Sequence, residues 1–317
     1  MSKQDSNVAV WAALAGNIAV AVAKFIAAAL TGSAAMTSEA VHSLVDSINE
    51  LLLLYGISRS TRAADAQHPL GYAREVYFWS FVVALLIFTM GAGVSAYEGI
   101  DRLAHPQPIS APLAIFVVLG LSLLFEGTSW VVGVRAFRAA SGGLSWWKAF
   151  RRSKDPPAFI VVFEDSAALL GIFAAAAGTI ATIVTGDGRW DGIASLVIAL
   201  ILAGVALLLA QESKGLLIGE RADPQLASAI MRIAAAMPGV CSANSIATVQ
   251  LAPANVIATL SLDFFDYMRA PDIERAVIEL EDKIKREHPE VSALFVKPQT
   301  EKTFRDQRER VLGSAPP

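Results

Sequence analysis

The sequence has 317 residues, of which 54% are hydrophobic and only 17% are charged, and its mean hydropathy is +0.50. A domain that folds in water does not carry so much apolar sequence, so the composition indicates an integral membrane protein in a lipid bilayer. The net charge of -3 says little about partners, because membrane spans separate the charges into two compartments. The basic residues are scattered without a nucleic-acid-binding motif, and the single cysteine, Cys241, excludes an internal disulfide and a cysteine-rich metal site.

Apolar runs of helical length follow one another along the first two thirds of the chain. After a short cytoplasmic N-terminus, residues 1–7, they predict a six-helix transmembrane domain over residues 8–218. A tight turn at Gly32 joins the first two spans, and prolines mark the start of the fifth. The predicted spans cover residues 8–30, 34–58, 76–100, 113–137, 156–185 and 191–210.

The basic residues lie mainly on one side of these spans. Three arginines lie between spans two and three, and six lysines and arginines lie between spans four and five, in a long basic loop at 138–154 and just before it. The other side offers only Arg102 and Arg189. By the positive-inside rule we expect a multi-pass protein with both termini in the cytoplasm, in the plasma (inner) membrane if the chain is bacterial.

The remainder of the chain has the composition of a water-soluble domain. Residues 219–299 show a helix, two strands, a helix and a strand, which predicts a small cytoplasmic α+β domain of αββαβ order with its helices on one sheet face. The helices are expected at 224–236 and 271–287, and the strands at 242–252, 255–265 and 291–297. Residues 300–317 are charged and end in GSAPP, so we predict a disordered tail.

Span two carries polar side chains in the middle of an apolar run. Glu39, His42, Asp46 and Asn49 follow at intervals of three, four and three residues and therefore share one helical face. A carboxylate at mid-depth costs several kcal/mol unless it faces a partner or water. His42 and Asp46, one turn apart, can offer a nitrogen and an oxygen to one divalent cation. The alternative is a polar face that only holds helices together.

Span five carries Glu164 and Asp165 side by side in apolar surroundings. At 1.5 Å per residue, Asp165 lies about 12 Å along its helix from the cytoplasm, and His42 and Asp46 lie about 12 to 18 Å along theirs from the other side. In a core of about 30 Å these positions meet near mid-depth. Because adjacent helical residues point about 100° apart, we favour Asp165 as the ligand. Glu164 is then a fourth ligand, an outer partner or a proton carrier.

Two further residues are candidates along the pathway. Glu126 lies within span four and either lines the cavity or pairs with a basic residue. His68 precedes a proline in the loop after span two and is first of all a turn residue, although it could bind the metal where it arrives from the cytoplasm.

Several motifs in order give the chain a family resemblance. SEAVHSLVDSINELLLLYGIS is followed by HPLGYAREVYFWSFV, HPQP, LFEGTSW and FEDSAALLG. This series resembles the cation diffusion facilitator family, in particular the branch that includes mitochondrial zinc transporters. The resemblance implies six transmembrane helices, a cytoplasmic αββαβ domain of metallochaperone-like, ferredoxin-like fold, a homodimer, and export of divalent metal from the cytoplasm in exchange for protons.

The resemblance also implies a ligand set. It puts the span-two ligands on His42 and Asp46 and the second span-five ligand on Asp165. The first span-five ligand falls on Val161, a departure for which Glu164 is the obvious substitute, followed by water or Asn49. The cytoplasmic domain has one histidine, His288, and one cysteine, so we expect it to serve mainly in dimerisation.

A transport mechanism follows from ligand chemistry. A metal ion needs neutral imidazole and ionised carboxylates, so metal and protons compete for one site that opens alternately to each side. Zn²⁺ suits the set best, with H⁺ as the counter-ion, and Mn²⁺, Fe²⁺ or Co²⁺ is the alternative substrate. The sequence predicts a secondary active transporter without catalytic residues or cofactor. The alternatives from other classes are an intramembrane metalloenzyme, for which no HExxH motif is present, and a metal sensor or scaffold.

Overall fold

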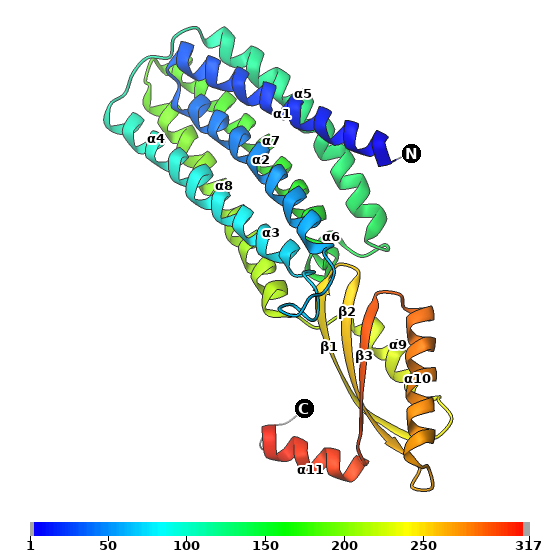
Figure 1. The fold of residues 1–317 in the computed structure, drawn as a ribbon. Coiled ribbons are helices and arrows are strands. Elements are labelled where there is room, and N and C mark those ends of the chain that lie inside the picture. Colours follow the sequence, from blue (N-terminus) through cyan, green and yellow to red (C-terminus); the bar gives the residue numbers. More distant parts are fainter. Residues whose placement is uncertain (1–2, 313–317) are drawn as a thin grey trace. The chain divides into compact units, whose positions relative to one another are not determined.

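A computed structural model describes residues 3–312, and Figure 1 shows the order of its elements along the chain. The chain divides into two compact units, a helical unit that ends at Lys214 and a second unit that begins at Gly215. The helical unit contains α1 (Lys3–Thr31), α2 (Ala34–Ser60), α3 (Glu75–Leu86), the π-helical segment η1 (Ile87–Ala92), α4 (Gly93–Ala104), α5 (Pro112–Ala140), α6 (Trp146–Arg152), α7 (Pro156–Thr185) and the greater part of α8 (Arg189–Ile218).

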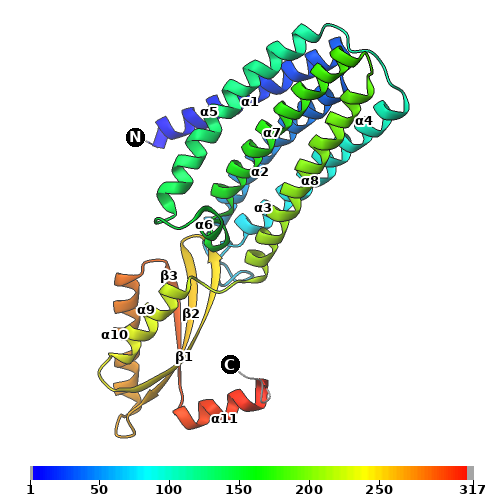
Figure 2. The same ribbon diagram turned by 180° about the vertical axis from the view of Figure 1, so that it is seen from behind.

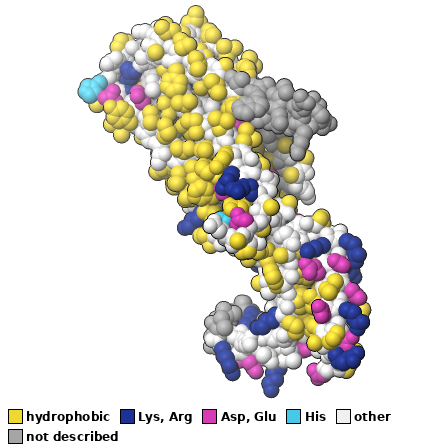
Figure 3. All heavy atoms as spheres, viewed as in Figure 1, with side chains coloured by type: hydrophobic (Ala, Val, Ile, Leu, Met, Phe, Trp, Pro, Cys, Tyr) yellow, Lys and Arg dark blue, Asp and Glu magenta, His cyan; other side chains and the backbone are white. Residues whose placement is uncertain are grey.

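Four helical segments among the described residues are long and apolar enough to cross a membrane: 75–104, 112–140, 156–185 and 189–218. They confirm the third to sixth predicted spans. The described apolar part of α1, Gly16–Thr31, is shorter, and polar residues interrupt the apolar sequence of α2. Figure 3 shows hydrophobic side chains over most of the visible face of this unit, as a lipid environment requires.

The ends of the long helices follow from local sequence. Proline stands in the first turn of α5 and of α7, where its missing N–H costs no hydrogen bond. Gly186 ends α7 in the left-handed conformation, with φ of 72°. Ser33 begins α2, and its side chain accepts a hydrogen bond from the Met36 amide. The region predicted as a basic loop at 138–154 also contains the short helix α6.

Helix α2 lies at the centre of the helical unit. It packs against α1, α3, α4 and α7, while α5 packs against α1 and α7. Figure 2 shows α7 and α8 side by side when the molecule is seen from behind. Glycines allow this approach, because a Cβ at Gly178 of α7 would collide with Ala194 of α8. Because α2 packs against four other helices, its polar residues Glu39, His42 and Asn49 are buried inside the bundle.

The second unit has the predicted αββαβ order. It contains α9 (Pro224–Ala235), β1 (Val240–Ala252), β2 (Asn255–Phe264), α10 (Ala270–Glu287), β3 (Val291–Pro298) and α11 (Glu301–Leu312). The three-stranded mixed sheet has the order β1-β2-β3, with β1 antiparallel and β3 parallel to β2. Alternate residues of β2, Ala258, Leu260 and Leu262, form a core with Ile230 of α9 and Leu280 of α10, so both helices cover one sheet face.

Helix α11 corrects the prediction of a disordered tail over residues 300–317. Residues 301–312 are helical, and residues 313–317 lie outside the described part of the chain. The reason is tertiary contact: Asp263 of β2 accepts a hydrogen bond of 3.0 Å from the Glu301 amide, and Gln307 accepts from Lys297 and Gln299. Composition alone does not reveal these contacts.

Candidate metal site in the helical unit

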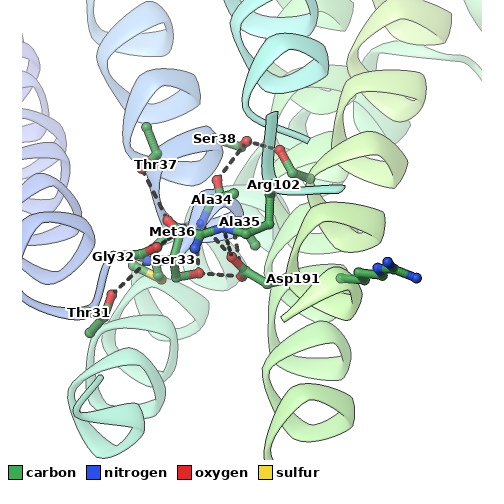
Figure 4. A network of polar contacts seen from close by, with 12 residues as sticks. Thr31, Gly32, Ser33, Ala34, Ala35, Met36, Thr37, Ser38, Arg102 and Asp191 are labelled. Carbon is green, nitrogen blue, oxygen red and sulfur yellow. Dashed lines mark hydrogen bonds and ion pairs between the residues drawn. The ribbon is translucent and has the colours of Figure 1, made fainter. Parts of the chain in front are cut away.

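The N-terminus of α2 is fixed by a carboxylate from another helix. Asp191 of α8 is fully buried and accepts hydrogen bonds of 2.5 Å from Ser33 Oγ and the Ala34 amide and of 3.3 Å from the Ala35 amide (Figure 4). Arg102 of α4 balances the charge, with its Nε 3.6 Å from Asp191 Oδ2. A carboxylate at a helix N-terminus stabilises the free N–H groups and the helix dipole. This contact sets the axial position of α2 and of its polar face.

His42 and Asp46 form the first part of the site. His42 is 1% exposed, and its Nδ1 lies 3.3 Å from Asp46 Oδ1 one turn later. The two atoms are close but not in hydrogen-bonding geometry, and neither ring nitrogen of His42 has a hydrogen-bond partner among the described residues. An unpartnered buried polar atom lowers the stability of a protein by about 1–3 kcal/mol. These atoms are therefore candidates for binding a ligand.

The shortage of partners extends along the same face of α2. Buried side-chain atoms without a hydrogen-bond partner in the described part of the chain include Glu39 Oε1, His42 Nδ1, His42 Nε2, Asp46 Oδ1 and Asn49 Oδ1. All of them are atoms that can bind a divalent cation. The polar face predicted from the sequence is thus buried and only partly satisfied by protein.

The two acidic residues of α7 lie in different surroundings. Glu164 is buried and its Oε1 accepts a hydrogen bond of 2.7 Å from Asn49 Nδ2, which joins α7 to α2. Asp165 is only partly buried, and its Oδ2 accepts a hydrogen bond of 2.8 Å from Ser129 of α5. Val161, at the position where the family resemblance implies a ligand, is 39% exposed and lies near Gly133 of α5.

The four predicted ligands are therefore not gathered at one point. Among the side chains that the structure describes, no three His, Cys, Asp or Glu residues group closely enough to hold a metal ion. Instead, His42 meets Asp46, Glu164 meets Asn49, and Asp165 meets Ser129. The contacts connect α2, α7 and α5, the helices that carry the candidate residues.

A buried lysine is the component that sequence reasoning missed. Lys24 of α1 is 0% exposed, and its Nζ lies 3.1 Å from Glu39 Oε2 and 3.4 Å from Glu126 Oε1. It also donates a hydrogen bond of 2.7 Å to Ser43 Oγ. Glu126 thus pairs with a basic residue, one of its two predicted roles, while Glu39 is part of an ion pair between α1 and α2.

The signal for this cluster was present in the hairpin of the first two helices. Lys24 lies eight residues before Gly32 and Glu39 lies seven residues after it, so an antiparallel pair places them opposite each other. A lysine in a membrane span is as costly as a carboxylate and needs a partner for the same reason. Counting outward from the turn therefore pairs Lys24 with Glu39.

His68 lies outside this buried region, in the loop between α2 and α3. Its Nδ1 lies 3.4 Å from Asp65 Oδ1, and its ring lies against Tyr72 with a centroid separation of 4.2 Å. The Tyr72 hydroxyl donates a hydrogen bond of 2.6 Å to Asp65, which lowers the pKa of Asp65 to about 2 with help from the His68 amide. Whether His68 receives metal from the cytoplasm stays a prediction.

The second unit offers few metal-binding groups. Cys241 is exposed and free, and His288 lies 3.6 Å from Glu290 without forming part of a larger cluster in the described residues. That this unit serves mainly in dimerisation stays a prediction.

The sequence of residues 10–218 matches the cation efflux transmembrane domain. The chain belongs to the cation efflux family. This is the cation diffusion facilitator family that the ordered motifs resemble, so the resemblance is confirmed. Members of the cation efflux family are transporters and not enzymes, which removes the intramembrane metalloenzyme, and the chain is a multi-pass integral membrane protein.

The chain is similar to several curated proteins, among them two whose names include zinc. The chain is 34% identical over 265 residues to the mitochondrial proton-coupled zinc antiporter SLC30A9 of Xenopus laevis, a match that covers 81% of this chain and 47% of the relative. The human protein of the same name is 33% identical over 82% of this chain and 47% of its own length. Metal tolerance protein C4 of Arabidopsis thaliana is 36% identical over 73% of this chain and 51% of its own length. The chain thus spans about half the length of these relatives.

Proposed function

We propose that the protein is a Zn²⁺/H⁺ antiporter that exports zinc from the cytoplasm by alternating access. It acts as a homodimer with six membrane spans per chain and with both termini in the cytoplasm. The names of the relatives support zinc as the substrate and protons as the counter-ion. The membrane depends on the type of cell. It is the inner membrane if the chain is bacterial, or an organelle membrane as in the mitochondrial relatives.

The observation that carries this proposal is the unpartnered polar face of α2. His42 is almost fully buried beside Asp46, and both of its ring nitrogens lack a hydrogen-bond partner among the described residues. A divalent cation supplies what these atoms lack, because it accepts electron pairs from imidazole and carboxylate together. In the proposed metal-bound state, α7 brings Asp165 to the same ion, and Glu164 completes the four-coordinate set in place of Val161.

The ligand types favour zinc among divalent cations. One imidazole and carboxylates in a four-coordinate set suit Zn²⁺, and Mn²⁺, Fe²⁺ and Co²⁺ are the competing substrates for a mixed nitrogen and oxygen set. The proposed ligand set contains no cysteine; the chain's single cysteine, Cys241, lies in the second unit.

Protons and metal use the same atoms in this mechanism. Zinc binds only when His42 is neutral and Asp46 and Asp165 are ionised, so each binding event releases protons and protonation on the other side releases the metal. The candidate ligands lie in two separate pairs, His42 beside Asp46 and Asp165 beside Ser129, and the His42 ring nitrogens lack a hydrogen-bond partner among the described residues. Rocking of α7 against α2 then assembles and separates the ligands.

The test is zinc uptake into proteoliposomes under an imposed pH gradient. The parent is expected to transport zinc, and His42→Ala, Asp46→Ala and Asp165→Ala are expected to be silent. The chain offers a matched control in His105→Ala, because His105 and Asp101 form an exposed pair of the same spacing, 3.2 Å apart. This control should transport like the parent.

Two results separate the parts of the proposal. If the protein transports manganese or iron but not zinc, the proposed site stands and the assignment of zinc as the substrate is wrong. Transport by folded Asp46→Ala and Asp165→Ala overturns the site itself.

A further inference from the structure

The Lys24 ammonium lies in a shell of oxygen atoms. Glu39 and Ser43 of α2 and Glu126 of α5 each contribute one oxygen, at 3.1, 2.7 and 3.4 Å from Lys24 Nζ. The Lys24 and Glu39 side chains are 0% exposed and that of Glu126 is 16% exposed, so bulk water takes little part. The arrangement resembles a cation-binding site that is occupied by the side-chain ammonium of Lys24 on α1.

The chemistry of this shell differs from that of the candidate zinc site. It contains two carboxylates and a hydroxyl, and no nitrogen or sulfur ligand. Such all-oxygen sets suit Mg²⁺, Ca²⁺ and Mn²⁺, whereas zinc sites use imidazole or thiolate. Without the ammonium, the two carboxylates would form the core of a site for a hard divalent cation.

The carboxylate of Glu39 is packed between Lys24 and α7. Its second oxygen, Oε1, lies directly against Gly171 of α7, so closely that a Cβ at that position would overlap it. Glu39 is therefore held between Lys24 and the α7 backbone. Because Glu39 lies on the same helical face as His42, one turn earlier, a cation bound there would lie close to the candidate zinc site.

We infer that Lys24 determines cation specificity, because its ammonium occupies an all-oxygen cation site formed by Glu39, Ser43 and Glu126 and excludes hard divalent cations from it. The ammonium supplies one positive charge against two carboxylates, so it balances half of their negative charge without a metal ion. His42 and Asp46 are then the place where a transported cation binds. The functional part of this inference rests on the proposed zinc transport, but the occupied oxygen site does not.

The test is Mn²⁺ binding to the full-length protein in detergent, read from the loss of the electron paramagnetic resonance signal of free Mn²⁺. The Asp46→Asn background is used throughout, so that binding at the candidate zinc site does not contribute. We expect Lys24→Met to bind one Mn²⁺ more per chain than its Asp46→Asn parent. The extra ion should disappear when Glu126→Gln is added, and Lys24→Arg, which keeps the charge, should bind no extra ion.

Folding is followed in each variant by size-exclusion chromatography and circular dichroism. Lys24→Gln, which keeps a hydrogen-bond donor between the two carboxylates, is measured beside Lys24→Met and should also gain the ion. A folded Lys24→Met or Lys24→Gln that binds no extra Mn²⁺ overturns the inference, as does an extra ion that persists with Glu126→Gln. Failure of the proposed function is measured separately: the unmodified protein would then bind no more zinc than its Asp46→Asn variant.

Discussion

Asn49 Nδ2 on α2 lies 2.7 Å from Glu164 Oε1 on α7, and both side chains are buried. This hydrogen bond is a direct link between the two helices that carry the candidate ligands. It also satisfies a carboxylate that would otherwise be costly inside a membrane domain.

Replacing Asn49 by alanine removes this link and leaves the Glu164 carboxylate short of a partner. We expect Asn49→Ala to lower the free energy of unfolding by about 1–3 kcal/mol, the cost of an unsatisfied buried polar group. Denaturant unfolding in detergent measures the change. Gln67→Ala is the control, because Gln67 is an exposed residue of the loop between α2 and α3, and its effect should be within about 0.5 kcal/mol. Equal effects of the two substitutions would contradict the account.

Adding a methyl group at Gly171 should disturb the Lys24 cluster. A Cβ there would overlap Glu39 Oε1, so Gly171→Ala forces the carboxylate or α7 to move, at a cost of about 1–3 kcal/mol. Gly120→Ala on α5 is the matched control, because a Cβ at Gly120 meets nothing within 4 Å. Since alanine is the better helix former, the control should be neutral or more stable by up to about 1 kcal/mol. Denaturant unfolding in detergent measures the free energy of unfolding of both variants, which should fall for Gly171→Ala and stay equal or rise for Gly120→Ala.

Loss of Asp191 should loosen the start of α2. Asp191→Ala removes the acceptor of the Ala34 and Ala35 amides, and losing such a cap costs about 0.5–2 kcal/mol. Faster hydrogen exchange at these amides is the specific sign. Asp101→Ala, an exposed change on α4 directly before Arg102, should leave their exchange unchanged. Unchanged exchange in Asp191→Ala would mean that the cap does not hold α2.

The loop between α2 and α3 has a pH-dependent contact that Tyr72→Phe removes. The Tyr72 hydroxyl is the main cause that lowers the pKa of Asp65 to about 2, so the variant should titrate closer to the ordinary value near 4. Because the folded pKa lies below the unfolded one, the contact stabilises the loop above the unfolded pKa, and this contribution is lost as the pH falls through about 2. Carboxyl ¹³C NMR of Asp65 measures the shift, with Tyr97→Phe as the control. An unchanged pKa in Tyr72→Phe would contradict this assignment.

Much of the fold could be predicted because its signals are local. Pro156 begins α7 and the apolar run ends at Thr185, as expected, and the strand pattern in VIATLSLDFF became β2. Features that depend on contacts between distant residues were missed. Helix α11 is held by Asp263, and the π-helical segment η1 has no turn or proline signal that would reveal it.

The candidate site was predictable in part for the same reason. The face of α2 with His42 and Asp46 follows from helical spacing alone, and the structure buries it. The partners of that face come from other helices. Spacing within one helix does not show that Lys24 reaches Glu126, or that Asp191 caps α2, because these contacts require the arrangement of α1, α5 and α8.

The central claim is that zinc and protons compete for one site that includes His42 and Asp46. The most direct measurement is the internal pH of proteoliposomes, read with a trapped pH-sensitive dye, after zinc is added outside. We expect zinc entry through the parent to drive protons out and make the interior more alkaline, with no change for Asp46→Ala and a full response for His105→Ala. Zinc entry without a change in internal pH, or the same pH change in folded Asp46→Ala, would contradict the account.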